Sequence, residues 1–174
     1  MKKIILSLAL LATSLLLQAK ELNTPQSFTL TTVDENNITI TETKEGFDIK
    51  EFKDKAVLIV LFGHNCPPCK KEIPELITLT NNHKDDLAII AIEVQNYSEA
   101  SLKEFKEAYH MNYNTIAGVN HYDFTSYLAN RAGHPNGLRL PFLVAINKDG
   151  EVEGVQEGRV RGDELEFMVQ NLNE

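Results

Sequence analysis

Two nearly continuous apolar segments, Val57–Phe62 and Leu87–Val94, are the strongest pattern in the sequence. Both lack the strict alternation of a half-exposed strand, so each predicts a strand that is covered on both faces. Between them, the segment from Cys66 to about Asn81 carries apolar residues at helical spacing and predicts an amphipathic helix. A strand, a helix and a strand in this order predict a right-handed βαβ unit with parallel pairing.

Shorter patterned segments on both sides of this unit complete one domain. Before it, alternation and turn residues predict a β-hairpin and a further short strand. After it, two helices alternate with strands, and a hairpin and a final helix end the chain. These segments are Phe28–Val33, Ile38–Thr41 and Glu45–Ile49, then Ser98–Tyr109, Asn114–Gly118, Tyr122–Ala132, Phe142–Ile146, Glu151–Val155 and Gly162–Leu172. The predicted fold class is α/β, with a central mixed sheet flanked by helices and an N-terminal hairpin extension.

Composition limits the classes of function. A chain of 174 residues with 43% hydrophobic content is long enough for one domain with a substantial core. Its net charge is −8, and it would be about −10 without the first 19 residues. An acidic chain is a poor candidate for nucleic-acid binding, because contacts to phosphates need a basic surface. We therefore expect no nucleic-acid partner, and we expect a monomer.

The first 19 residues predict an export signal. Two lysines precede an apolar stretch of about 14 residues, Ile4–Leu17, and a small-residue cleavage site ends at Ala19. This stretch is short for a membrane-spanning helix, which needs about 20 residues, and an uncleaved anchor is the alternative. We divide the chain into a signal peptide (1–19), a lead-in (20–27) and one domain (28–174) that is exported to the bacterial periplasm.

The chain has two cysteines, Cys66 and Cys69, and both stand where the first long strand gives way to the helix. Pro67 and Pro68 between them suit the first turn of a helix, whose backbone N–H groups have no helical partner. This end of a helix carries partial positive charge, which favours a thiolate. A second sulfur one turn away can resolve a mixed disulfide. The motif predicts dithiol–disulfide exchange, with Cys66 as the nucleophile and Cys69 as the resolving thiol.

Three other uses of the cysteine pair compete with dithiol–disulfide exchange. A structural zinc site usually has four ligands, and the sequence has no second cysteine pair. An inert structural disulfide over so short a loop would constrain the unfolded chain very little. A copper or zinc carrier that uses Cys66, Cys69 and His64 is an alternative of a different class, because thiolates bind soft metals. Redox chemistry without a metal or cofactor is the preferred interpretation.

The order of elements and the cysteine motif resemble the thioredoxin superfamily, and in particular its exported TlpA/ResA-like branch. The resemblance extends from about Phe28 to Leu172. It is carried by the block Phe62-Gly63-x-x-Cys66-Pro67-Pro68-Cys69-Lys70-Lys71-Glu72-x-Pro74, the step Leu140-Pro141-Phe142 and the hairpin Asn147-Lys148-Asp149-Gly150. Members of this branch reduce disulfides outside the cytoplasm, often during cytochrome c maturation.

The resemblance implies roles for two more residues. Pro141 would be the cis-proline that faces the disulfide, although a cis bond occurs at only about 5% of X-Pro positions in general. Glu72 would be the acidic residue near the sulfurs that tunes their ionisation and shuttles protons. The alternative for Glu72 is an ordinary solvated position on the helix surface.

Near the cysteines the sequence also departs from the family pattern. Asn65 stands where relatives commonly have tryptophan, which leaves substrate choice open. His64 is unusual there too, and we expect it to face solvent, with a cation that stabilises the thiolate as the alternative. Glu93 ends an apolar strand, and we expect it to be a surface residue at the edge of a loop, with a second acid of the site as the alternative.

Together these features predict a periplasmic thiol-disulfide reductase. It would act on protein disulfides, including the Cys-x-x-Cys-His segment of apocytochrome c, and a thiol donor in the membrane would keep it reduced. An oxidase or an isomerase would use the same chemistry. Both are disfavoured, because the sequence shows no large helical insertion and no added dimerisation domain.

Overall fold

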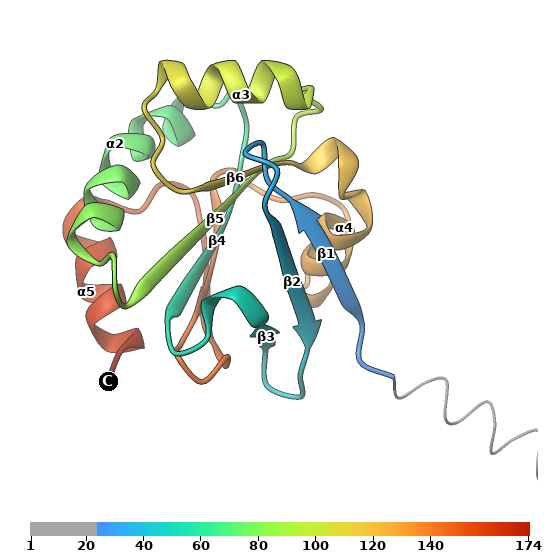
Figure 1. The fold of residues 1–174 in the computed structure, drawn as a ribbon, viewed down its shortest axis with the longest axis vertical. Helices are drawn as coiled ribbons and strands as arrows, with labels where there is room; N and C mark the ends of the chain where they lie inside the picture. Colours follow the sequence, from blue (N-terminus) through green and yellow to red (C-terminus); the bar gives the residue numbers. More distant parts are fainter. Residues whose placement is uncertain (1–23) are drawn as a thin grey trace, which may run out of the picture.

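The computed structural model describes residues 24–174 and shows two β-sheets with four α-helices (Figure 1). The larger sheet has five strands in the order β6-β5-β4-β7-β8, and the smaller has three in the order β1-β2-β3. β4 and β5 are parallel, whereas β7 and β8 each run antiparallel to their neighbours. The predicted mixed sheet and βαβ unit are therefore confirmed.

The bounds of the elements follow the sequence pattern closely. The strands are β1 (Ser27–Thr31), β2 (Asn37–Glu42), β3 (Phe47–Ile49), β4 (Ala56–Phe62), β5 (Leu87–Glu93), β6 (Asn114–Ala117), β7 (Phe142–Ile146) and β8 (Val152–Glu157). The helices are α2 (Pro67–Asn82), α3 (Glu99–Ala108), α4 (Tyr122–Arg131) and α5 (Gly162–Leu172), with short 3-10 turns at Lys50–Phe52 and Gly118–Asn120. The segment before β4 thus contains a helical turn.

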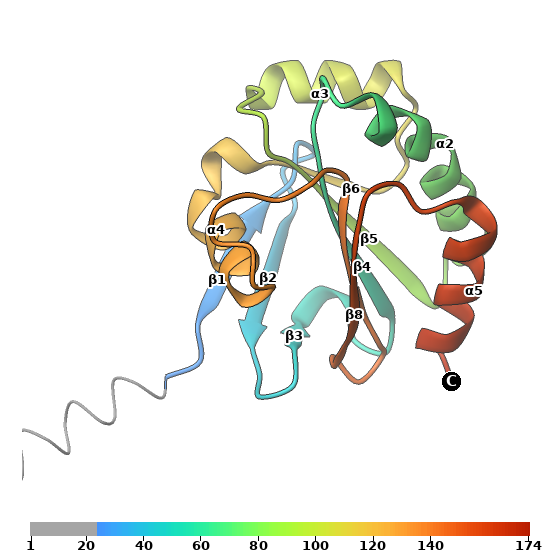
Figure 2. The ribbon, with the colours of Figure 1, turned by 180° about the vertical axis from the view of Figure 1, so that it is seen from behind.

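β4 divides the core into two clusters. All seven of its residues are buried, and alternate side chains point to opposite faces of the sheet. Leu58 and Val60 belong to the cluster under α2, α3 and α5, whereas Ile59 and Leu61 belong to the cluster under α4 and the three-stranded sheet. Figures 1 and 2 show these two layers on the two sides of the central sheet. Both faces of β4 are therefore covered, which explains why its sequence is apolar without interruption.

The N-terminal hairpin extension is confirmed, and β3 makes it a three-stranded antiparallel sheet. The first strand ends at Thr31, two residues earlier than predicted. Here the backbone N–H of Thr32 donates to the carbonyl of Asn36 at 2.8 Å, and the Thr32 hydroxyl accepts from the N–H of Asn36 at 3.1 Å. These bonds close a local turn, which competes with continuation of the strand.

The last strand, β8, lies at the edge of the five-stranded sheet (Figure 2). Its pairing with β7 shifts register between Ala145 and Ile146, as at a β-bulge.

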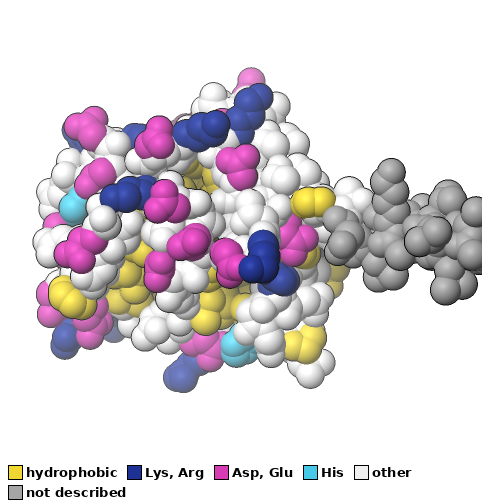
Figure 3. All heavy atoms as spheres, turned by 90° about the horizontal axis from the view of Figure 1, so that it is seen from below, with side chains coloured by type: hydrophobic (Ala, Val, Ile, Leu, Met, Phe, Trp, Pro, Cys, Tyr) yellow, Lys and Arg dark blue, Asp and Glu magenta, His cyan; other side chains and the backbone are white. Residues whose placement is uncertain are grey.

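Acidic and basic side chains are interspersed on the face shown in Figure 3. Within residues 24–174, no helix combines the length and the apolar character needed to cross a bilayer. The predicted signal peptide lies outside the described residues.

His83, directly after α2, binds the carboxylates of Glu166 on α5 and of Asp86 in the turn before β5. Its Nε2 lies 2.7 Å from Glu166 Oε1 and its Nδ1 lies 3.3 Å from Asp86. Burial opposes protonation, but the hydrogen bonds and charges of Glu166 and Asp86 outweigh it and raise the pKa of His83.

This arrangement predicts a pH-dependent contribution to stability. A histidine whose folded-state pKa is raised stabilises the fold fully below its unfolded pKa of about 6.5, and the effect is lost as pH rises through the folded value. Glu166→Gln is expected to lower the free energy of unfolding by about 0.5 kcal/mol at pH 5.5, since Glu166 is partly exposed. Urea unfolding should show no difference from wild type at pH 9. An equal loss at both pH values would contradict this role.

Candidate active site

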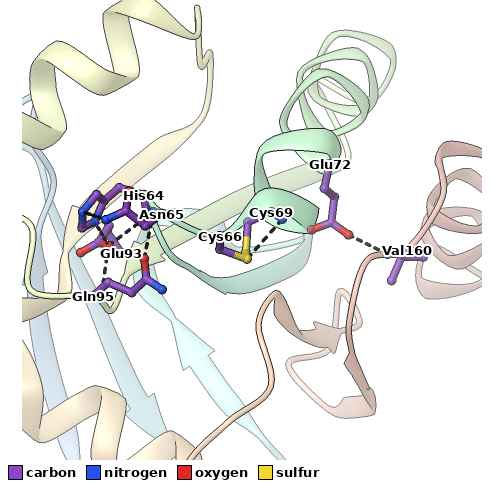
Figure 4. Close-up of a disulfide and its surroundings, with 8 residues drawn as sticks. All are labelled: His64, Asn65, Cys66, Cys69, Glu72, Glu93, Gln95 and Val160. Atoms are coloured by element: carbon purple, nitrogen blue, oxygen red, sulfur yellow. Dashed lines mark hydrogen bonds and ion pairs between the residues drawn. A yellow bond between two sulfur atoms is a disulfide. The ribbon is translucent and has the colours of Figure 1, made fainter.

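The two cysteines lie at the N-terminus of α2, as predicted, and are joined by a disulfide (Figure 4). Cys66 is the N-cap residue, and its Sγ accepts a hydrogen bond from the backbone N–H of Cys69 at 3.3 Å. Pro67 occupies the first helical position, where its missing N–H costs nothing. The exposed fractions are 7% for Cys66 and 2% for Cys69. Cys66 is thus the more accessible residue, which suits a nucleophile.

The helix end provides a positive field for the sulfur at its tip. The first turn of α2 contains no acidic residue, so the partial positive charge of the N-terminus is not neutralised there. The N–H of Cys69 is already directed at Cys66 Sγ, and it would donate to a thiolate formed at that atom. The geometry therefore favours ionisation of Cys66 over that of Cys69.

Glu72 is buried, with an exposed fraction of 1%, so the alternative of a solvated helix surface is wrong. It lies one turn beyond Cys69 on α2, and residues three apart share a helix face. Its Oε1 accepts a hydrogen bond from the backbone N–H of Val160 at 2.7 Å (Figure 4). Burial raises the pKa of Glu72 to about 7, although the Val160 bond opposes the shift. Glu72 therefore populates both protonation states near neutral pH.

The burial of Glu72 comes from a segment far along the chain. The loop between β8 and α5 covers α2, and Val160 belongs to the same apolar cluster as Cys66 and Cys69. On the neighbouring turn, Glu75 forms an ion pair with Arg159 of this loop. This pair fixes the loop against the helix, and the loop in turn shields Glu72 from water.

The Leu140–Pro141 peptide bond is cis, as the family resemblance implied. Pro141 directly precedes β7, whose Phe142 pairs with Leu61 near the end of β4. Because β4 leads into the turn before Cys66, Pro141 lies at the same end of the sheet as the disulfide. The carbonyl of Pro141 accepts from the N–H of Gly158, which fixes this segment to the end of β8.

Two expectations about the neighbourhood of the cysteines are wrong. Glu93 is not a surface residue, because its exposed fraction is 0%. His64 does not simply face solvent, because its side chain is only 19% exposed and its Nδ1 lies 2.9 Å from Glu93 Oε1. The His64 ring also stacks on Tyr97, with ring centroids 4.0 Å apart. Glu93, His64 and Tyr97 form one cluster beside the cysteine turn (Figure 4 shows the first two).

Sequence reasoning missed Gln95, which joins this cluster. Its side-chain Oε1 accepts from the backbone N–H of Asn65 at 2.9 Å. A signal for the cluster was present in the strand register, since Glu93 is aligned with Phe62 in the parallel pair β4–β5. Because Glu93 and Phe62 are the last residues of two paired parallel strands, the Glu93 side chain can reach the turn that follows β4.

The metal-carrier alternative requires a third ligand beside the two sulfurs. Within residues 24–174, no three His, Cys, Asp or Glu side chains are gathered as metal ligands. His64, which a carrier would need together with the two sulfurs, is bound to Glu93 instead. The cluster around Glu93 and the Cys66–Cys69 disulfide lie side by side at the turn between β4 and α2.

Comparison with known proteins agrees with this reading of the site. The family model described as Redoxin matches residues 23–172. Thiol-disulfide oxidoreductase ResA of Halalkalibacterium halodurans is 29% identical over 134 residues, which cover 75% of this chain and 67% of ResA. Thioredoxin-like protein YneN of Bacillus subtilis is 23% identical over 128 residues, which cover 70% of this chain and 68% of YneN.

Solved structures show the same fold at lower sequence identity. A thiol:disulfide interchange protein of the thioredoxin family from Chlorobium tepidum superposes with a TM-score of 0.67 at 21% identity, covering 87% of this chain and 97% of that protein. A DsbF homologue from Corynebacterium diphtheriae gives 0.66 at 17% identity, covering 85% of each chain. Together with the matched family model, these structural similarities identify the fold as thioredoxin-like. The chain belongs to the Redoxin family and is a TlpA/ResA-like thiol-disulfide oxidoreductase of the thioredoxin superfamily.

Proposed function

We propose that this oxidoreductase works as a reductase of protein disulfides outside the cytoplasm. In this proposal the Cys66 thiolate attacks a substrate disulfide, and one substrate sulfur leaves and takes up a proton. Cys69 then loses its proton and attacks Cys66, which releases the second substrate sulfur and forms the Cys66–Cys69 disulfide. Two electrons pass from the protein to the substrate, and an external dithiol must restore the reduced pair.

The observation that supports the reducing direction is the buried Glu72 next to the pair. A strongly oxidising pair needs a reduced form that is stabilised as a thiolate. An ionised carboxylate on the same face of α2 disfavours a neighbouring thiolate, and burial of the sulfurs disfavours it further. The reduced form is therefore less stable, and the pair gives up its electrons more readily.

Glu72 also suits the second step of the reaction. Cys69 is buried and must lose its proton before it can attack. A carboxyl group whose pKa is about 7 can accept this proton at neutral pH and return it later. We assign Glu72 this proton-transfer role. We assign Pro141 a place in the substrate-binding surface beside the disulfide, where an extended substrate segment would lie.

The export signal in residues 1–19 supports action in the periplasm, where a thiol donor in the membrane would reduce the Cys66–Cys69 disulfide. The resemblance to the TlpA/ResA-like branch favours the heme-attachment Cys-x-x-Cys-His segment of apocytochrome c as a substrate. Protein disulfides in general are the broader class to which this segment belongs.

The reduction potential tests the proposed direction. Equilibration with glutathione or dithiothreitol buffers, followed by alkylation of free thiols, is expected to give a value below about −220 mV, towards the about −270 mV of thioredoxin. A value near −120 mV, typical of the oxidant DsbA, would refute the reductase. A value near −180 mV would favour the isomerase.

A further inference from the structure

In the turn between β4 and α2, the backbone N–H groups of His64, Asn65 and Cys66 all donate hydrogen bonds. The N–H of Cys66 donates to the carbonyl of Gly63 at 3.1 Å, which closes the turn. The N–H of His64 donates to Glu93 Oε1 at 3.1 Å, and the N–H of Asn65 donates to Gln95 Oε1 at 2.9 Å. Two of the three bonds therefore end on side chains of Glu93, the last residue of β5, and of Gln95, which follows the strand.

Glu93 is the centre of this connection. Besides His64, its Oε1 accepts from the backbone N–H of Gln95 at 3.0 Å, and its Oε2 accepts from the backbone N–H of Tyr97 at 2.9 Å. His64 Nδ1 lies 2.9 Å from Oε1, and a proton on this nitrogen makes it a donor to the carboxylate. A carboxylate with no exposed surface thus binds two loops through three backbone amides and one imidazole.

Packing joins the same two loops. The rings of His64 and Tyr97 are stacked with an interplanar angle of 7°. The Gln95 side chain lies directly over Gly63, where an added Cβ would come within 2.2 Å of it. A glycine is therefore required at position 63 for the Gln95 amide to reach Asn65. We call residues 63–65 and 94–97 together the active-site rim.

We propose that Glu93 is a positioning residue for thiol-disulfide exchange, which fixes the rim so that a protein substrate presents its disulfide in line with Cys66. The inference rests on the proposed role of Cys66 as the attacking sulfur. The rim leads directly into Cys66, and a shift of about 1 Å in a reacting group can slow a reaction about a hundredfold. A small reagent approaches the sulfur without touching the rim, so it does not depend on this placement.

The variant Glu93→Gln separates these two kinds of reaction. A carboxamide has one oxygen, so either the N–H of Tyr97 or those of His64 and Gln95 must face an NH2 group that cannot accept. We expect the rate constant for exchange with insulin disulfides to fall about tenfold. Alkylation of reduced Cys66 by iodoacetamide, measured at a pH where the thiol is fully ionised, should change less than about twofold.

Exchange is measured in both directions, by reduction of insulin and by oxidation of reduced, unfolded ribonuclease. Both reactions need a substrate sulfur in line with Cys66 Sγ, as attacked atom in the reduction and as attacking atom in the oxidation, so a positioning role slows both. If the protein favours oxidation, the proposed reductase fails, but the ratio between the variant and the wild type still reports on Glu93. The two proposals can therefore fail separately.

Glu166→Gln is the matched control. Glu166 lies on α5, and its carboxylate, like that of Glu93, binds a histidine: Oε1 lies 2.7 Å from His83 Nε2. This variant should leave the insulin and iodoacetamide rates unchanged. Gly63→Ala disturbs the rim without a change of charge, by displacing Gln95, and it should show the same split; it also tests the proposal if Glu93→Gln does not fold. An unchanged insulin rate, or an equal loss with both reagents in folded variants, would overturn the proposal.

Discussion

Replacement of Cys66 by serine is expected to abolish thiol-disulfide exchange, with a loss of at least about 1,000-fold in insulin reduction. A serine hydroxyl is a very weak nucleophile at neutral pH, and its oxygen cannot form a disulfide with a substrate sulfur. Cys69→Ala should behave differently, because Cys66 can still attack a substrate while no second sulfur remains to release it. This variant is expected to accumulate a mixed disulfide with its substrate.

The pair of variants is compared by non-reducing gel electrophoresis after export of each protein with its own N-terminal segment. Mass spectrometry of the proteins attached to Cys66 in Cys69→Ala identifies the substrates. Apocytochrome c among these proteins would support the proposed substrate. Mixed disulfides on Cys69 in the Cys66→Ser protein, together with none on Cys66 in the Cys69→Ala protein, would reverse the assignment of the two sulfurs. The double variant Cys66→Ser/Cys69→Ala is the control for nonspecific association.

Glu72→Gln is expected to stabilise the protein at alkaline pH. The pKa of Glu72 is raised from 4.5 in the unfolded chain to about 7 in the folded one. Its contribution to stability is therefore fully present below pH 4.5 and is lost as pH rises through about 7. This difference corresponds to about 3 kcal/mol at pH 8. Glutamine cannot ionise, and its oxygen can still accept from Val160, so the variant avoids this loss.

Urea unfolding of the oxidised protein at pH 8 and at pH 4.5 measures the effect. The stabilisation should appear at pH 8 and vanish at pH 4.5, where the wild-type carboxyl is largely protonated when folded. A variant that is less stable than wild type at pH 8 would show that the carboxylate is favourably bound there. The same substitution should slow exchange, since Cys69 would lose its proton acceptor, so stability and activity change in opposite directions.

The strands, the helices and the position of the cysteine motif could be predicted because the signals are local. An unbroken apolar run such as Val57–Phe62 is compatible with a strand covered on both faces, and Pro67 and Pro68 suit the first turn of a helix. The resemblance to a known family then supplied the cis bond before Pro141, which neighbouring residues alone would not indicate. Small differences, such as the early end of β1, come from side-chain bonds within turns.

The sequence by itself determined that two sulfurs stand at the tip of a helix, because strand, turn and helix signals are contiguous over Val57–Asn82. Only the tertiary structure decided the state of the two carboxylates. Glu72 is shielded by Val160, which is 88 positions away, and Glu93 binds His64, which is 29 positions away. Whether an acidic side chain is solvated or buried depends on which distant segment packs over it, and the local hydrophobic pattern does not identify that segment.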